Sequence, residues 1–169
     1  LYFEYNTKAT EQGYSSVHTL HTAQVPLHTW CDLAVKITCD TLPDEKYYLE
    51  HNYNGKKSQV VGRYDAGWYV ARVRDLGRYT VVADLTPPEV VAVKPEAWVT
   101  NGSVNFKISD KGSGVNTYRV ELDGAFCLFE YDAKRSRLSC KTADMPLVKG
   151  KKHTFTITVT DQCGNCTKK

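Results

Sequence analysis

Short segments in which apolar and polar residues alternate, separated by tight turns, constrain this fold more than any other feature of the chain. Leu33, Val35 and Ile37 alternate with smaller or more polar neighbours, which predicts a strand with one buried and one solvated face. Asn54-Gly55 and Asp123-Gly124 are strong signals for two-residue hairpin turns. Further alternating sets are Val104, Phe106 and Ile108; Tyr118, Val120 and Leu122; and Phe155, Ile157 and Val159.

Residues 1–84 are expected to form a β-sandwich of short strands, because turns recur about every 8–12 residues. The expected strands are residues 1–5, 14–20, 32–38, 47–53, 59–64, 68–74 and 78–83. Since strand character already begins at Leu1, we expect the chain to start inside a larger protein.

Residues 89–169 are expected to form a second sandwich of about seven strands with an immunoglobulin-like architecture. The expected strands include residues 90–93, 104–108, 118–122, 126–131, 137–141 and 155–159. Asn101-Gly102 is expected to turn the chain after the first of these strands. The Cys…Trp…Cys spacing of antibody domains is missing, so the similarity is one of architecture. The predicted fold class is all-β, with two tandem antiparallel β-sandwich modules.

A proline-rich joint, residues 85–88, is expected between these two modules. Proline fixes φ and biases the residue before it toward extended geometry, so Thr86-Pro87-Pro88 predicts an extended, semi-rigid spacer. The spacer is too short to act as a free tether. We therefore expect two modules, residues 1–84 and 89–169, held in a nearly rigid rod.

The charge of the chain is modest and unevenly divided. The net charge is +3, with 9 Lys/Arg against 10 Asp/Glu in residues 1–84 and 13 against 9 in residues 85–169. Much of the excess lies in the loop Val148-Lys149-Gly150-Lys151-Lys152 and in the tail Lys168-Lys169, which suits either a solvated loop or a contact with an anionic polymer. No known nucleic-acid module is present, and no apolar run approaches the ~20 residues that span a bilayer. We expect neither a nucleic-acid partner nor a transmembrane segment.

Six cysteines suit an oxidising compartment without proving one. Cys127 and Cys140 are directly opposed if a hairpin turns at residues 132–135, which also pairs Phe129 with Leu138 and Tyr131 with Ser136. Directly opposed residues can be bridged, so a Cys127–Cys140 disulfide is one prediction and two packed thiols are the other.

Cys163 and Cys166 form a second candidate disulfide, in the sequence Cys163-Gly164-Asn165-Cys166. A redox-active C-x-x-C motif needs a strand-to-helix setting that lowers a thiol pKa, and this one follows a strand and meets only three further residues. A short structural disulfide or two free thiols are the remaining alternatives.

Several motifs occur in a set order along the chain. They are Gly77-Arg78-Tyr79-Thr80-Val81-Val82-Ala83-Asp84 with Thr86-Pro87-Pro88; Asp110-Lys111-Gly112-Ser113-Gly114-Val115; Leu122-Asp123-Gly124; Phe129-Glu130-Tyr131-Asp132; and Val159-Thr160-Asp161-Gln162-Cys163-Gly164-Asn165. In this order they resemble the C-terminal, non-catalytic region of exported lysostaphin-type (LytM-like) zinc metallopeptidases, metallopeptidase family twenty-three, of Gram-negative bacteria. The resemblance covers most of residues 15–169.

The resemblance implies an accessory function rather than catalysis by this part of the chain. It implies that a peptidase domain of the same chain precedes these modules, and that the modules position it near peptidoglycan or an envelope protein. It also implies an extracytoplasmic location: periplasmic, outer membrane-associated or secreted. We expect no catalytic residue, no cofactor and no metal ligand in this fragment.

The motif His28-Thr29-Trp30-Cys31-Asp32 formally matches the H-x-x-x-D zinc motif of that family. A catalytic zinc needs three protein ligands and an open position, and the second family motif, H-x-H, is absent from this chain. A third ligand such as His18 or His51 would be required for a weak enzyme at this position.

The glycine- and aspartate-rich motifs of the second module are explained by turn chemistry. Gly112, Gly114, Gly124 and Gly164 are expected to supply positive φ angles, and Asp110 and Asp161 to cap their turns. A calcium site using Asp110, Asp123 or Asp161 is the alternative. Calcium takes six to eight oxygen ligands, which two or three scattered aspartates do not supply.

The three tryptophans, Trp30, Trp68 and Trp98, are the candidate ligand surface. If the three side chains are exposed and coplanar, they support a second hypothesis, a stand-alone adhesion or carbohydrate-binding protein. If they are buried, they are core residues. Their exposure therefore discriminates between the two hypotheses.

Overall fold

The computed structural model describes residues 5–8, 13–21 and 27–169. The chain divides into two compact units, Leu1–Leu85 and Thr86–Lys169. Antiparallel sheets make up both units, with one short α-helix, so the predicted all-β fold class is confirmed. The strand expected over residues 1–5 falls mostly on residues 1–4, which lie outside the described residues.

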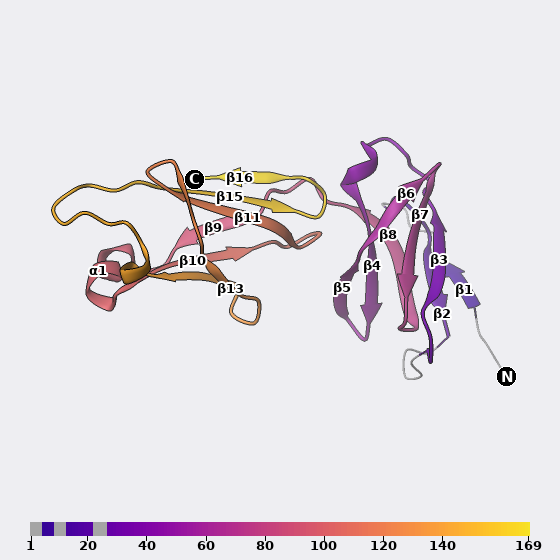
Figure 1. Ribbon diagram of the computed structural model, residues 1–169. Helices are drawn as coiled ribbons and strands as arrows, with labels where there is room; N and C mark the ends of the chain where they lie inside the picture. The colour runs from indigo at the N-terminus through magenta and orange to yellow at the C-terminus, as the bar shows by residue number, and fades with distance from the viewer. Residues whose placement is uncertain (1–4, 9–12, 22–26) are drawn as a thin grey trace. The chain divides into compact units, whose positions relative to one another are not determined.

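The first unit is a sandwich of a five-stranded and a three-stranded sheet, with strand orders β1-β2-β8-β4-β5 and β3-β7-β6 (Figure 1). Its strands are β1 (Tyr5–Lys8), β2 (Val17–Leu20), β3 (Cys31–Lys36), β4 (Tyr47–Tyr53), β5 (Lys56–Val60), β6 (Gly62–Asp65), β7 (Trp68–Val73) and β8 (Gly77–Ala83). A short 3-10 turn, Asp44–Lys46, precedes β4.

Alternate residues of the central strands build the core of the first unit. In β4 every second residue from Tyr47 to His51 is buried, and β8 follows the same period. The predicted alternation of Leu33, Val35 and Ile37 is confirmed, because Val35 and Ile37 are buried and Leu33 packs against the core. The buried cluster comprises Val35, Ile37, Tyr47, Leu49, Tyr69, Ala71, Val73, Tyr79 and Val81.

The single strand predicted over residues 59–64 is wrong, because the chain changes sheets there. Strand β5 ends at Val60 and pairs with β4, whereas β6 begins at Gly62 and pairs with β7. Val61 between them is 68% exposed. A Cβ on Gly62 would lie 2.3 Å from the Val70 carbonyl oxygen, so only glycine fits where β6 meets β7.

The second unit packs two four-stranded sheets, with strand orders β13-β14-β10-β9 and β12-β11-β15-β16 (Figure 1). Its strands are β9 (Glu89–Ala92), β10 (Ser103–Ser109), β11 (Val115–Leu122), β12 (Ala125–Cys127), β13 (Glu130–Asp132), β14 (Arg137–Lys141), β15 (Phe155–Asp161) and β16 (Cys166–Lys168). The helix α1 (Trp98–Asn101) follows a 3-10 turn at Pro95–Ala97, and another 3-10 turn spans Thr142–Asp144.

Alternation also builds the core of the second unit, in β10, β11 and β15. Val104, Phe106 and Ile108 are buried as predicted, and so are Ile157 and Val159. Tyr118 departs from the prediction, because it is 37% exposed while Val120 and Leu122 of the same strand are buried.

Two of the predicted hairpin turns are confirmed with the expected backbone geometry. Tyr53 pairs with Lys56 across Asn54-Gly55, and Leu122 pairs with Ala125 across Asp123-Gly124. Both turns have φ > 0 at their two central residues, as a type I′ turn requires. Asn101-Gly102 instead ends α1, a helix that the sequence pattern did not predict, with Gly102 in the left-handed region.

The strand predicted over residues 126–131 is wrong for the same reason as its counterpart in the first unit. Strand β12 pairs with β11 and ends at Cys127, whereas β13 pairs with β14 and begins at Glu130. Leu128 at the crossing is 73% exposed. In both units, a strand that looked continuous in sequence crosses from one sheet to the other.

The hairpin register predicted around residues 132–135 is also wrong. The structure pairs Asp132 with Arg137, and Tyr131 rather than Phe129 with Leu138. The Asp132 carboxylate accepts hydrogen bonds from the backbone N–H groups of Lys134, at 3.0 Å, and Arg135, at 3.2 Å. This cap makes Asp132 the last strand residue and moves the turn to residues 133–136.

Candidate functional site

A groove in the first unit combines an exposed tryptophan with polar side chains. It encloses about 370 Å³ where the crossing at Val61 meets the end of β7 and the segment before β3. Trp30 lies at this groove and is 54% exposed. Polar and charged groups of its lining include Ser58, Gln59, Arg72, Arg74 and Asp75.

The buried side of the groove is formed by two stacked aromatic rings. The His51 and Tyr79 rings lie 4.6 Å apart between centroids, with 25° between their planes. His51 Nε2 donates to the Leu76 carbonyl oxygen at 2.9 Å, and the Tyr79 hydroxyl donates to the Asp75 carbonyl oxygen. Burial raises the pKa of Tyr79, so this hydroxyl stays protonated at neutral pH.

Neighbouring segments fix the mouth of the groove beside Trp30. Cys31 pairs with Val73 at the start of β3, and the Leu27 N–H donates to the Arg74 carbonyl oxygen at 3.0 Å. Asp32 lies 3.8 Å from Arg72, and both side chains are largely exposed. An exposed indole face beside guanidinium, amide and hydroxyl groups can stack on a sugar ring while donating hydrogen bonds to hydroxyl or carboxylate oxygens.

The three tryptophans predicted as a ligand surface do not form one platform. Trp68 is 43% exposed, but it pairs with Lys36 at the opposite end of the β3–β7 ladder from Cys31 and Val73. Trp98 belongs to the second unit, where its ring packs edge-on against Phe106. The Trp98 Nε1–H donates to the Val93 carbonyl oxygen at 2.8 Å, and this partly buried tryptophan packs against the core of the second unit.

The motif at His28 does not gather a zinc site among the described residues. His28 is exposed, and Asp32 pairs with Arg72. The two candidate third ligands are engaged elsewhere: His18 Nδ1 shares a hydrogen bond of 2.8 Å with the Tyr5 hydroxyl, and His51 donates within the groove. Within the described part of the first unit, no three His, Cys, Asp or Glu side chains lie close enough to share a metal ion.

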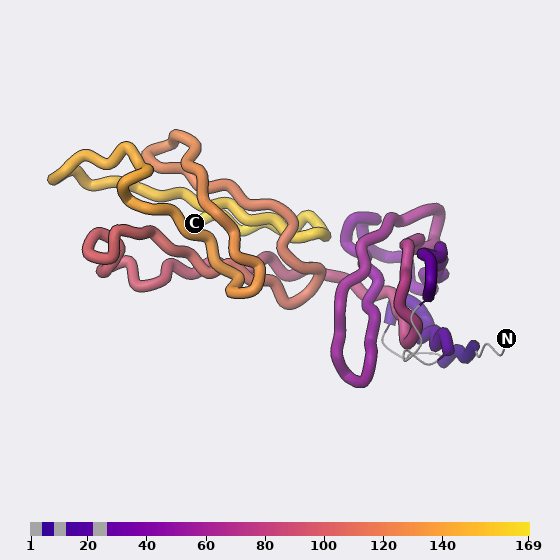
Figure 2. The backbone as a smooth tube through the Cα atoms, turned by 60° about the horizontal axis from the view of Figure 1, so that its bottom comes forward, coloured from indigo at the N-terminus to yellow at the C-terminus, as the bar shows by residue number. Residues whose placement is uncertain are grey.

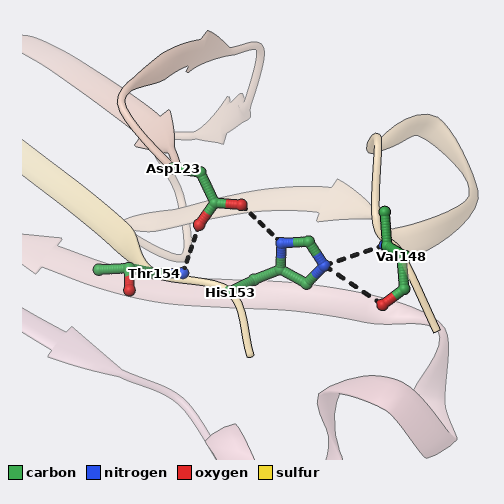
Figure 3. Close-up of polar contacts among 4 residues, drawn as sticks. All are labelled: Asp123, Val148, His153 and Thr154. Carbon is green, nitrogen blue, oxygen red and sulfur yellow. Dashed lines mark hydrogen bonds and ion pairs between the residues drawn. The ribbon is translucent and has the colours of Figure 1, made fainter. Parts of the chain in front are cut away.

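A histidine–carboxylate pair in the second unit was not singled out from the sequence (Figure 3). His153 Nδ1 lies 2.7 Å from Asp123 Oδ2, and the Val148 N–H donates to His153 Nε2 at 2.9 Å. Asp123 Oδ1 accepts from the Thr154 N–H at 2.8 Å. Both ring nitrogens are therefore used to hold the loop of residues 148–152, and the arrangement is that of a structural anchor rather than a catalytic base.

The aspartates of the second unit cap turns, as the sequence predicted for Asp110 and Asp161. Asp110 Oδ2 accepts from the N–H groups of Gly112, at 2.9 Å, and Gly114, at 2.7 Å. Asp161 Oδ1 accepts from the Asn165 N–H at 2.8 Å.

Two details correct the expectations for these motifs. Gly114, Gly124 and Gly164 have positive φ angles, whereas Gly112 does not, because its N–H reaches Asp110 from ordinary backbone geometry. Asp110 and Asp161 bring carboxylate oxygens within 4.8 Å of each other, but Asp123 is bound to His153 and Thr154 instead.

All six cysteines are free thiols. Cys127 is buried and Cys140 is partly buried in the second unit. Cys163, in the turn between β15 and β16, is buried, whereas Cys166 at the start of β16 is exposed. Cys31 and Cys39 are both exposed in the first unit. The disulfides considered from the sequence stay predictions.

Two comparisons with known proteins found similar sequences or structures. Residues 1–84 match a family model described as the Zu5-like domain. The fibronectin(III)-like modules of CbhA from Clostridium thermocellum are similar to this chain at 14% sequence identity, over 85% of this chain and 83% of theirs, with a TM-score of 0.37. No curated protein matches the chain.

In the described part of the chain, no helix has the length and apolar character needed to cross a membrane. The residues matched by the Zu5-like family model end where the first compact unit ends, within one residue.

Proposed function

We propose that this chain is a non-catalytic accessory region that binds a cell-envelope polymer, and that the groove beside Trp30 makes the contact. The exposed Trp30 indole in a groove lined by Arg72 and Gln59 is the observation that carries the proposal. Ligand sites are concave and often lined by aromatic side chains, which combine a large apolar surface with a polar group. The region positions whatever catalytic domain it is joined to.

The polymer proposed is peptidoglycan, and the proposed parent is an exported metallopeptidase of the lysostaphin type. The order of motifs from Gly77 to Asn165 supports this parent. Peptidoglycan offers sugar rings for stacking and peptide carboxylates for Arg72 and Arg74, which both lie at the groove. An extracytoplasmic location is part of the same proposal.

Co-sedimentation with purified peptidoglycan sacculi tests the binding. Trp30→Ala is expected to lower the bound fraction at least about tenfold, the loss of one well-packed aromatic contact. Trp68→Ala is the matched control, because Trp68 is also exposed on the three-stranded sheet but lies outside the groove. Equal binding by wild type and Trp30→Ala, or hydrolysis of the sacculi by the isolated chain, would contradict the proposal.

The parent is tested separately, by the coding sequence upstream of Leu1. An adjoining domain with H-x-x-x-D and H-x-H motifs is expected in the same reading frame. A different neighbouring domain would reject the peptidase parent while leaving the binding role of the groove to the sedimentation assay.

A second candidate function is adhesion to a different glycan or to a protein, through the second unit. Here Phe126 and Leu128 are exposed, and the Arg119 guanidinium lies 5.2 Å from the Phe126 ring centroid. The rings of Tyr118 and Tyr131 lie 5.7 Å apart beside them. Binding to a glycan array that is lost in Phe126→Ala but kept in Trp30→Ala would favour this function over the first.

A further inference from the structure

We propose that Cys127 and Cys140 are a modification site: they form a disulfide between the two sheets of the second unit when the chain meets an external disulfide. The pair was considered from the sequence as a cross-strand bridge within one hairpin. The structure removes that geometry, because Cys127 lies on β12 and Cys140 on β14, which belong to different sheets.

The strand registers direct both side chains into the space between the sheets. Cys127 pairs with Val120 of β11, and Cys140 pairs with Val104 of β10. Directly paired residues of antiparallel strands project from the same face, and both valines are buried in the core. The side chains of Cys127 and Cys140 therefore both point into the space between the two sheets, each toward the sheet that holds the other cysteine.

The crossing of the chain at Leu128 brings the two cysteines to the same edge of the sandwich. Strands β12 and β13 are the edge strands of their sheets and are joined by only two residues, and β14 lies next to β13. Cys127 belongs to the buried cluster of this unit, and Cys140 packs against that cluster. The Cys140 thiol donates to the Lys141 carbonyl oxygen at 3.6 Å, and Cys127 is the neighbouring thiol that helps to raise the pKa of Cys140.

Only one of the two sulfurs is open to a reagent. Cys140 lines a cavity of about 820 Å³ together with Leu128, Glu130, Lys141 and Asp144, whereas Cys127 is 8% exposed. An external disulfide can therefore reach Cys140 first. Cys127 stays shielded until the second step.

The reaction is a two-step thiol–disulfide exchange. Cys140 loses its proton to solvent, and its thiolate attacks one sulfur of the external disulfide, whose S–S bond breaks and releases one thiolate. The Cys127 thiolate then attacks Cys140 Sγ, forms the Cys127–Cys140 bond and releases the second external thiolate. Two protein thiols are oxidised, and one external disulfide is reduced to two thiols that take up the two protons.

The surroundings of Cys140 make the first step slow at neutral pH. Burial, followed by the neighbouring Cys127 and by the carboxylates of Asp144 and Glu130, raises the pKa of the Cys140 thiol to about 11. Lys141 is the cation beside it at the cavity. Because the thiolate is the attacking species, the rate is expected to rise about tenfold per pH unit between pH 7 and pH 9.

The experiment uses the full, reduced wild-type chain and oxidised glutathione as the probe. After incubation at pH 9 under native conditions, remaining thiols are alkylated and the chain is digested with trypsin. Lys134 and Arg137 separate the two cysteines, so the bridge appears as a linked peptide pair that falls apart on reduction. We expect Cys127 and Cys140 to be linked and unalkylated, and the melting temperature of the second unit to rise by roughly 10 °C.

Two variants keep the result independent of folding defects. Cys140→Ser is expected to leave Cys127 as an unreacted thiol, because the buried sulfur cannot meet glutathione directly. Cys127→Ser is expected to stop at a Cys140–glutathione mixed disulfide. A linked pair that joins other cysteines, or a wild-type chain in which Cys127 and Cys140 are both alkylated after oxidation, would overturn the proposal.

Discussion

His153 and Asp123 are joined by a 2.7 Å contact between Nδ1 and Oδ2 that links two loops 30 residues apart in sequence. The loop held by His153 carries Lys149, Lys151 and Lys152 and lies at one end of the second unit, near α1 (Figures 1 and 2). Through this contact and the Val148 backbone, His153 attaches the lysine-rich loop to the Asp123-Gly124 turn (Figure 3).

Protonation of Asp123 is predicted to release this loop. The Thr154 N–H and then the His153 ring hold the pKa of the Asp123 carboxyl below its ordinary value. Because the folded state lowers this pKa, the ionised carboxylate stabilises the fold at pH values above the ordinary carboxyl pKa. This stabilisation decreases as pH falls from the ordinary pKa to the lower pKa of the folded state. Hydrogen exchange of the Thr154 amide, corrected for intrinsic exchange, is expected to lose protection below about pH 4.

Asp123→Asn is the test variant, because asparagine tolerates the positive φ of this turn. Its Thr154 protection is expected to be lower than in wild type and to vary little with pH. Asp132→Asn removes a carboxylate from another turn of the same unit and serves as control. Loss of wild-type Thr154 protection with a midpoint above the ordinary carboxyl pKa of about 4 would contradict the assigned pKa direction.

Gly62→Ala is predicted to destabilise the first unit by about 3 kcal/mol, at the upper end of overpacking effects. The added Cβ would meet the Val70 carbonyl oxygen at 2.3 Å and the Tyr69 ring at 2.7 Å, and the backbone atom cannot rotate away. Urea unfolding followed by the fluorescence of Trp30 and Trp68 measures the change.

Gly55→Ala is the matched control for this substitution. A Cβ on Gly55 meets no atom within 4 Å, so only its positive φ opposes alanine, at a cost of roughly 1 kcal/mol. Equal stability of Gly62→Ala and wild type would mean that the crossing from β5 to β6 can relax.

Leu49→Ala and Leu138→Ala are predicted to destabilise one unit each. Both leucines are fully buried, but they belong to two separate core clusters. Each substitution is expected to cost about 2–5 kcal/mol in its own unit. Hydrogen exchange read by mass spectrometry resolves the two units, and loss of protection in both units from a single substitution would contradict independent cores.

The joint Thr86-Pro87-Pro88 stays a prediction of a semi-rigid spacer. Independent crystal copies are expected to show closely similar angles between the units, because each proline restricts its own φ and the residue before it. Replacing Pro87 and Pro88 by glycine is expected to broaden the small-angle scattering distance distribution. Widely different angles among wild-type copies would mean that the joint is a loose linker.

The sequence by itself determined the strands whose patterning is local. Period-two alternation placed Val104, Phe106 and Ile108 in the core, and Asn54-Gly55 and Asp123-Gly124 turned the chain where type I′ geometry was expected. These features depend on residues two apart or on the φ angles of two adjacent residues, so neighbours in sequence carry the information.

Only the tertiary structure decided where the chain changes sheets. Residues 59–64 and 126–131 each looked like one strand in sequence, but Val60 and Gly62 pair with strands of different sheets, and so do Cys127 and Glu130. The groove beside Trp30 and the placement of Cys127 and Cys140 on different sheets at one core both arise at such crossings. Which partner strand a segment meets depends on long-range packing, because extended backbone offers the same hydrogen bonds to either sheet.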